Sequence, residues 1–214
     1  MKTRFISQYR AVTVSVINVL VTVLVLLIVI GWQGVSERTI AASLLILSFI
    51  VFCVSGILFT GRVMLNWQIE DIASYLVWER GFIIVATLAT VLGLTLLEDL
   101  LHSAGDSFWA RLGMMAYMFG AVLVVVAESN YISKQEWNDG QVVIYILLAF
   151  LAETAFGLAL LQTGLVVGWV GWLTILWNLG ILIIMLIVRP RDIYYPVIHY
   201  VAPFVIGIVL MAHG

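Results

Sequence analysis

Long runs of apolar residues, separated by short polar segments, occupy most of this chain. Each run is about 20 residues long, which is the length a helix needs to cross a hydrocarbon core of about 30 Å. The runs are residues 11–32, 39–60, 81–101, 108–128, 141–163, 166–188 and 193–212. This pattern predicts an all-α fold, a polytopic bundle of seven transmembrane helices that forms a single domain over residues 1–214.

The composition excludes a water-soluble globule. Of 214 residues, 64% are hydrophobic and only 10% are charged, which leaves too little polar surface to cover a globule in water. The lipid bilayer is therefore the first partner that we expect. The formal net charge of −2 and the lack of an extended basic stretch argue against binding of nucleic acid. A single cysteine, Cys53, excludes a disulfide framework within the chain.

Basic residues are distributed unevenly between the alternate loops of the predicted bundle. Lys and Arg are retained on the cytoplasmic side during insertion. With the N-terminus inside, the outer loops contain only Arg38 and Arg111. The cytoplasmic segments then contain Lys2, Arg4, Arg10, Arg62, Arg80, Lys134, Arg189 and Arg191. We therefore expect a multipass protein of the cell membrane with a cytoplasmic N-terminus and an outside C-terminus.

The segment between the second and third runs has a helical pattern of its own. Leu65, Ile69, Ile72 and Leu76 recur at helical spacing, which predicts a cytoplasmic helix over about residues 63–78 that lies in the membrane interface. Its acidic residues outnumber its basic ones, so attraction to anionic lipid is not its purpose. Such a helix either covers the inner end of the bundle or docks a protein partner.

Three polar side chains fall at similar depths in the last three runs. Counting about 1.5 Å per residue from the inner ends places Glu153, Asn178 and His199 at depths of roughly 18, 16 and 12 Å. A carboxylate alone in hydrocarbon costs at least a few kcal/mol, so we expect Glu153 to be neutral, paired or beside water. His199 can pair with Glu153 or share its proton, and Asn178 can both donate and accept hydrogen bonds. The sequence therefore predicts a polar site near the bilayer midplane.

A second cluster of polar residues lies at the outer end of the third run. Glu98, His102 and Asp106 are spaced by four residues and would share a face if the helix continued. Carboxylate and imidazole groups in this arrangement can bind a divalent metal. Gly105 is expected to end the helix before Asp106, so the alternative is a solvated acidic helix end with a contact between Glu98 and His102.

Two membrane cofactors do not fit the residues present. Retinal needs a Schiff-base lysine in the last span, and the chain contains only Lys2 and Lys134. A bis-histidine haem needs two histidines at matched depth, whereas His102 and His213 fall near the outer surface and only His199 is deep. We expect neither group, and the sequence names no other cofactor.

The fifth and sixth runs combine small, aromatic and polar residues in a characteristic order. They contain Ala152-Glu153-Thr154-Ala155-Phe156-Gly157, Leu160-Leu161-Gln162-Thr163-Gly164-Leu165 and Trp169-Val170-Gly171-Trp172. This segment, mainly residues 152–172, resembles the hairpin of small bacterial multipass membrane proteins that are classed as domains of unknown function. The resemblance implies a location in the bacterial inner membrane, and it implies no activity and no catalytic residue.

Three functions fit these observations, and the first is favoured. The protein handles a proton or a small apolar or amphipathic molecule through Glu153, Asn178 and His199. Alternatively, it is a non-catalytic accessory or scaffold subunit, with a protein partner or a second copy of itself, in which the polar residues only join helices by bonds of about 1 kcal/mol or less. The third function is a metal-dependent lipid-modifying enzyme that uses the outer acidic cluster. A function without catalysis is thus favoured over an enzyme.

Overall fold

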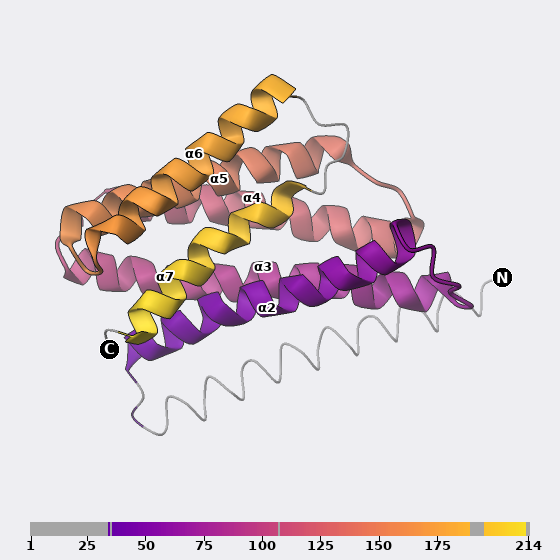
Figure 1. The fold of residues 1–214 in the computed structure, drawn as a ribbon, viewed down its shortest axis with the longest axis horizontal. Helices are drawn as coiled ribbons and strands as arrows, with labels where there is room; N and C mark the ends of the chain where they lie inside the picture. The colour runs from indigo at the N-terminus through magenta and orange to yellow at the C-terminus, as the bar shows by residue number, and fades with distance from the viewer. Residues whose placement is uncertain (1–33, 35, 107, 189–194, 213–214) are drawn as a thin grey trace.

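The computed structural model describes residues 34, 36–106, 108–188 and 195–212. Every regular element in these residues is a helix, which confirms the predicted all-α class for the described part of the chain (Figure 1). The elements are α2 (Glu37–Val63), α3 (Ile72–Ser103), α4 (Trp109–Lys134), α5 (Asp139–Thr163), α6 (Gly168–Val188), the short 3₁₀ helix η1 (Tyr195–Tyr200) and α7 (Val201–Ala212).

Five helices, α2 to α6, are long and apolar enough to cross a membrane. They correspond to the second to sixth apolar runs of the sequence. The predicted span over residues 11–32 lies outside the described residues. These five apolar helices are those expected of a membrane-embedded protein.

The last apolar run differs from the single span predicted over residues 193–212. Its described part is η1 followed by α7, which has 12 residues and is about 18 Å long, well short of a hydrocarbon core of about 30 Å. Pro203 gives the physical reason. Proline lacks an N–H group, and its ring clashes with the carbonyl group four residues earlier, so a regular α-helix does not continue through it. Pro203 is tolerated in the first turn of α7, where the N–H group has no helical partner.

The segment between α2 and α3 also differs from the prediction. The separate interfacial helix expected over about residues 63–78 is wrong, because residues 64–71 form a connection without a helix and Ile72 begins α3. Asp71 caps α3, since its carboxylate accepts hydrogen bonds from the backbone N–H of Ser74 at 3.3 Å and from the hydroxyl of Ser74 at 2.8 Å. The ring of Trp67 folds back onto Gly61, where it occupies the space that a Cβ atom would need.

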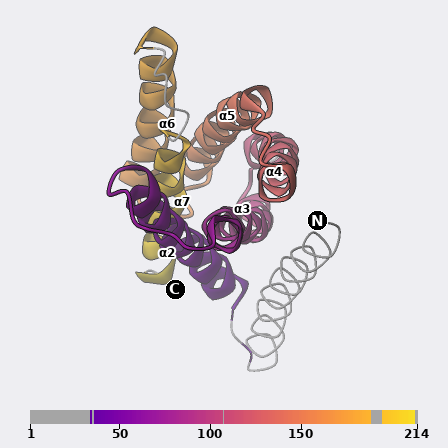
Figure 2. The ribbon, with the colours of Figure 1, turned by 90° about the vertical axis from the view of Figure 1, so that its right-hand side faces the viewer.

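The helices form a ring in which each one packs against its neighbour in the sequence. Figure 2, viewed along the helices, shows α2, α3, α4 and α5 in order, with α6 beyond α5 and α7 between α6 and α2. The stacked rings of Phe49 and Phe204, with centroids 4.5 Å apart, join α2 to α7. The 3₁₀ helix η1 contacts α2 and α5, and the side chains of its His199 and Tyr200 are buried.

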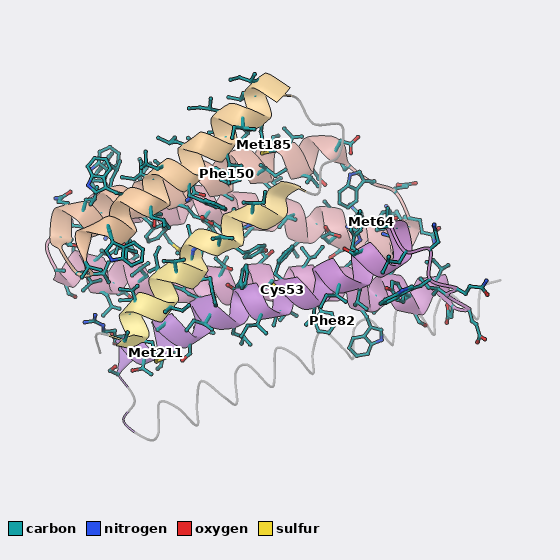
Figure 3. All side chains as sticks on the ribbon, in the orientation of Figure 1. Cys53, Met64, Phe82, Phe150, Met185 and Met211 are labelled. Carbon is teal, nitrogen blue, oxygen red and sulfur yellow. The ribbon has the colours of Figure 1, made fainter. Side chains whose placement is uncertain are left out.

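Glycines allow the closest approach between α5 and α6. A Cβ atom on Gly157 would lie 3.0 Å from the backbone oxygen of Gly171, and a Cβ atom on Gly171 would lie 3.0 Å from that of Gly157. Small residues commonly permit such backbone contact between helices in membranes. Phe150 of α5, labelled in Figure 3, is fully buried and belongs to the main apolar core. The face of α5 that carries Glu153 is thereby held against α6.

Candidate functional site

Glu153 and His199 form the centre of a buried polar cluster. Glu153 lies near the middle of α5, and His199 lies in η1 just before α7. The His199 Nδ1 atom is 2.7 Å from Glu153 Oε1, and both side chains are almost completely inaccessible to solvent. The two ionisable residues that the sequence places at similar depths are therefore in direct contact.

Hydroxyl groups extend this contact to α3. The Tyr145 hydroxyl is 2.6 Å from His199 Nε2 and 3.4 Å from the Tyr200 hydroxyl. The Tyr200 hydroxyl is 3.0 Å from Thr87 Oγ1. We call the five residues Glu153, His199, Tyr145, Tyr200 and Thr87 the buried polar chain. It connects α5, η1 and α3 without reaching solvent, because all five side chains are buried.

The donors along the buried polar chain have one consistent order. Thr87 donates to the carbonyl oxygen of Ile83 at 2.9 Å, so Tyr200 donates to Thr87. A neutral imidazole has one N–H donor and one acceptor nitrogen. The order that satisfies both neighbours has Tyr145 donating to His199 Nε2 and His199 Nδ1–H donating to Glu153 Oε1. The contact between Tyr145 and Tyr200, at 3.4 Å, is longer than the usual O–H···O bond.

Asn178, the third residue predicted for the site, lies beside the Glu153 carboxyl group. Its Nδ2 atom donates to the carbonyl oxygen of Thr174, one turn earlier in α6, at 2.8 Å. Its Oδ1 atom and Glu153 Oε2 are both buried and have no hydrogen-bond partner among the described residues. Nearly all buried polar groups in proteins are hydrogen-bonded. Two such oxygen atoms in adjacent residues are therefore the most unusual feature of this interior.

Four aromatic rings surround the imidazole of His199. The ring centroids of Tyr200, Tyr145, Tyr117 and Phe150 lie 4.0, 5.5, 6.0 and 6.4 Å from that of His199. These rings exclude water from the bond between His199 and Glu153. Depth along the runs locates the ionisable pair, but it does not indicate which tyrosines face it.

The cluster of Glu98, His102 and Asp106 does not form the metal site that its spacing suggests. Glu98 pairs with Arg111 rather than with His102, at 3.6 Å between Oε1 and Nε. The imidazole of His102 is bonded through Nδ1 to the backbone oxygen of Asp106 at 3.0 Å. Within the described residues, no group of three or more His, Cys, Asp or Glu side chains could hold a metal ion. The predicted ligand set of Glu98, His102 and Asp106 is therefore wrong.

The structural role of Asp106 explains this outcome. Gly105 has a φ angle of +108° and follows the end of α3. The helix therefore ends before Asp106, as predicted from the position of this glycine. The Asp106 carboxylate then accepts hydrogen bonds from the backbone N–H groups of Trp109 at 3.2 Å and Ala110 at 2.8 Å. Asp106 thus caps the first turn of α4, which is the usual role of an aspartate at this place.

A second buried polar cluster joins α2, α3 and α4, and we call it the ion network. Arg62 donates to both oxygen atoms of Glu79 at 2.8 Å. Arg80 lies 3.1 Å from Glu79 Oε1 through Nε and 3.4 Å from Glu128 Oε2 through Nη1. The guanidinium group of Arg80 also lies 4.7 Å from the ring centroid of Tyr131, a cation–π distance. Two carboxylates and two guanidinium groups therefore balance each other.

In the sequence, Arg62 and Arg80 are interpreted only as signals of orientation, and Glu79 and Glu128 are not predicted to form a site. A usable signal is present. Glu79 and Arg80 precede the third run directly, and Glu128 is the last residue of the fourth run. In antiparallel neighbouring spans these positions fall at the same end of the bundle, so opposite charges are expected to meet there.

Comparison of the chain with protein-family models, curated proteins and solved structures finds no match. The resemblance of residues 152–172 to uncharacterised bacterial hairpins therefore stays a prediction.

Proposed function

We propose that this protein handles protons inside the membrane, and that Glu153 and His199 bind and release a proton that is coupled to the passage of protons or of a small molecule. One observation carries the proposal. The carboxyl group of Glu153 is buried and bonded to an imidazole that is in turn bonded to a tyrosine hydroxyl, with distances of 2.7 and 2.6 Å. Ionisable groups at this depth in membrane proteins are commonly parts of proton relays.

The chemistry of the three groups suits a relay. The imidazole of His199 can take a proton on one nitrogen and give one from the other, because both nitrogens already face a hydrogen-bonding partner. Glu153 is the proton donor or acceptor at one end of this unit, and Tyr145 is the hydroxyl partner at the other. The hydroxyl groups of Tyr200 and Thr87 continue the hydrogen-bonded chain to α3. A change in the protonation of the site can therefore affect a second helix.

The topology that we propose for this function has seven crossings, a cytoplasmic N-terminus and an outside C-terminus in a bacterial inner membrane. Five crossings correspond to α2 to α6. Residues 11–32 supply another on the basis of their apolar length. The last crossing consists of η1 and α7 together, which have a combined length of about 30 Å at the usual rises of the two helix types. Glu153 and Asn178, near the middle of α5 and α6, then lie near the midplane.

Proton flux into liposomes tests the proposal. The purified protein is reconstituted with a pH-sensitive dye inside, and a pH gradient is applied across the membrane. We expect the wild-type protein to carry protons. Glu153→Gln should abolish the flux, because an amide side chain does not bind and release a proton near neutral pH. Glu70→Gln is the matched control, since Glu70 is exposed. Equal flux in the wild type and in Glu153→Gln would remove Glu153 from the mechanism.

A scaffold function is the second candidate, and the complete burial of the site favours it. Glu153, Asn178 and His199 are 1%, 0% and 0% exposed, so a ligand needs a rearrangement to reach them. In this function the three residues fix the positions of α5, α6 and η1, and the protein acts through a partner subunit or a second copy. Absence of flux, together with a stable homo-oligomer or a stoichiometric protein partner in mild detergent, would support this candidate.

A further inference from the structure

We infer that Trp177 of α6 is a positioning residue for the pair formed by Glu153 and His199. The indole N–H group of Trp177 donates a hydrogen bond to the backbone oxygen of Ile198 in η1 at 2.9 Å. This bond holds His199 so that its Nδ1 atom faces Glu153. The inference rests on the proposed function and deepens it, because it assigns control of the proton-binding contact to a third element, α6.

The acceptor of the Trp177 bond is directly connected to His199. The carbonyl group of Ile198 and the backbone nitrogen of His199 belong to one peptide group, which is planar and rigid. A donor that fixes the direction of this carbonyl group therefore also fixes the direction in which the chain enters His199. The torsions of His199 itself then bring Nδ1 to 2.7 Å from Glu153 Oε1.

The backbone of η1 needs support from its surroundings. A 3₁₀ helix has poorer hydrogen-bond geometry than an α-helix and is uncommon beyond three or four residues, and η1 has six. Pro203 adds to this weakness, because it lacks the N–H group that would bond to the carbonyl oxygen of His199 four residues earlier. The bonds of the buried polar chain hold η1 by the side chains of His199 and Tyr200. The bond from Trp177 holds its backbone.

The place of Trp177 in α6 indicates a specific role for its N–H group. Tryptophans are enriched at the membrane interface, whereas in the proposed topology Trp177 lies near the midplane. The residue is 36% exposed, so part of the ring faces lipid. Lipid chains offer no acceptor for an N–H group, and a protein group has to supply one. The carbonyl oxygen of Ile198 is that acceptor, which joins α6 to η1 at the depth of the site.

The residue after Trp177 contacts the other member of the pair. Asn178 is fully buried and lies beside the Glu153 carboxyl group. Two consecutive residues of α6 therefore contact the pair from both sides, one at the peptide group before His199 and one at the carboxyl group. The glycine contact between α5 and α6 fixes the helix that carries both. α6 thereby sets the separation between Glu153 and His199.

Nuclear magnetic resonance of the imidazole nitrogens tests the inference without a transport assay. The protein is labelled with nitrogen-isotope histidine and studied in mild detergent at neutral pH. It contains three histidines, and His199→Phe identifies the signals of His199. In the wild type we expect a proton on Nδ1 and none on Nε2, as the order of donors requires. Trp177→Phe keeps a ring and removes the N–H donor, so the Nδ1 proton signal should move upfield as the bond to Glu153 lengthens.

Proton flux into liposomes supplies a second readout. Trp177→Phe should lower the flux about fivefold, the factor that corresponds to the free energy of one hydrogen bond. Trp172→Phe is the matched control, because Trp172 lies on the same helix and is 57% exposed. This control should leave both the His199 signals and the flux unchanged. Trp177→Leu removes the same donor and is used if the phenylalanine variant does not fold.

Three results would overturn the inference. Unchanged His199 signals in Trp177→Phe would mean that the bond to Ile198 satisfies the indole group and does nothing else. Equal shifts in Trp172→Phe would show that loss of any tryptophan from α6 disturbs the site. A wild-type proton on Nε2 would contradict the arrangement that Trp177 is inferred to hold. Failure of the proposed function is a separate result, since a wild-type protein without proton flux would still show the shift of the His199 signals in Trp177→Phe.

Discussion

The two buried polar clusters of this protein place glutamates in opposite situations. In the ion network, both oxygen atoms of Glu79 accept from Arg62 at 2.8 Å, and Arg80 adds a further contact at 3.1 Å. In the buried polar chain, Glu153 has one partner, His199, and one oxygen atom without any. Both glutamates are inaccessible to solvent. Burial alone therefore does not determine the charge of a glutamate, whereas the number and kind of its donors do.

The difference also separates two roles within one bundle. A network of two guanidinium groups and two carboxylates joins α2, α3 and α4. A carboxyl group that lacks a cation can stay buried only if it is neutral, so its charge changes when a proton arrives or leaves. The ion network is suited to holding helices together, and the buried polar chain is suited to exchange of protons.

Glu79→Gln should produce the largest loss of stability. The substitution removes the negative charge between two guanidinium groups, and Arg80 loses its contact of 3.1 Å with Glu79. Breaking a buried ion pair from one side costs about 3–5 kcal/mol. Unfolding in a mild detergent titrated with a denaturing one measures this loss. Glu70→Gln, at an exposed position, is the control, and equal stability of the two variants would show that the network contributes nothing.

His199→Phe should have the next largest effect. Phenylalanine fills a similar volume among the four surrounding rings, but it offers neither the donor for Glu153 nor the acceptor for Tyr145. Two buried groups lose a partner, and we expect a loss of about 2–4 kcal/mol together with loss of proton flux. The same unfolding assay applies, with His102→Phe at the exposed C-terminal end of α3 as the control. A stability equal to that of the wild type would mean that the bonds of His199 make no net contribution.

Tyr145→Phe should cost less, because it removes one hydroxyl group and keeps the ring. His199 Nε2 then lacks its donor at 2.6 Å, and a single hydrogen bond contributes about 1 kcal/mol. Proton flux should fall more clearly than stability, since the relay loses a member while the packing remains. Flux at the wild-type rate in a folded Tyr145→Phe protein would confine the relay to Glu153 and His199.

Much of this fold is readable from the sequence, because length and hydropathy alone locate α2 to α6. The contact between Glu153 and His199 is also readable, since counting along the runs places the two residues at similar depths. The partners of that pair are not. Helices that are apolar on every side give no pattern from which their rotation can be deduced, so nothing in the sequence indicates that Tyr145 and Thr87 face His199.

Two features of the backbone are not visible in the hydropathy pattern, for identifiable reasons. Leu65 and Ile69 have helical spacing, but the cap formed by Asp71 and Ser74 starts a helix after them, and a polar residue in this position is a start signal that the sequence displays. In the last run, hydropathy is uniform across Pro203, whereas the backbone geometry of proline divides the run into η1 and α7. Hydropathy measures transfer to lipid, and it does not detect a missing N–H group.

Glu153→Gln should have the smallest effect on stability, within about 1 kcal/mol, although it is the same change that costs most at Glu79. Glutamine keeps an acceptor oxygen for His199 and, like a protonated glutamate, carries no charge. The comparison with Glu79→Gln therefore uses identical chemistry at two equally buried positions.

Unfolding of these two variants beside the wild type, in one detergent at neutral pH, tests the central claim most directly. We expect Glu153→Gln to unfold close to the wild type and Glu79→Gln to unfold several kcal/mol earlier. Losses of equal, large size at both positions would contradict the account, because they would mean that Glu153, like Glu79, is a charged group held by an ion pair.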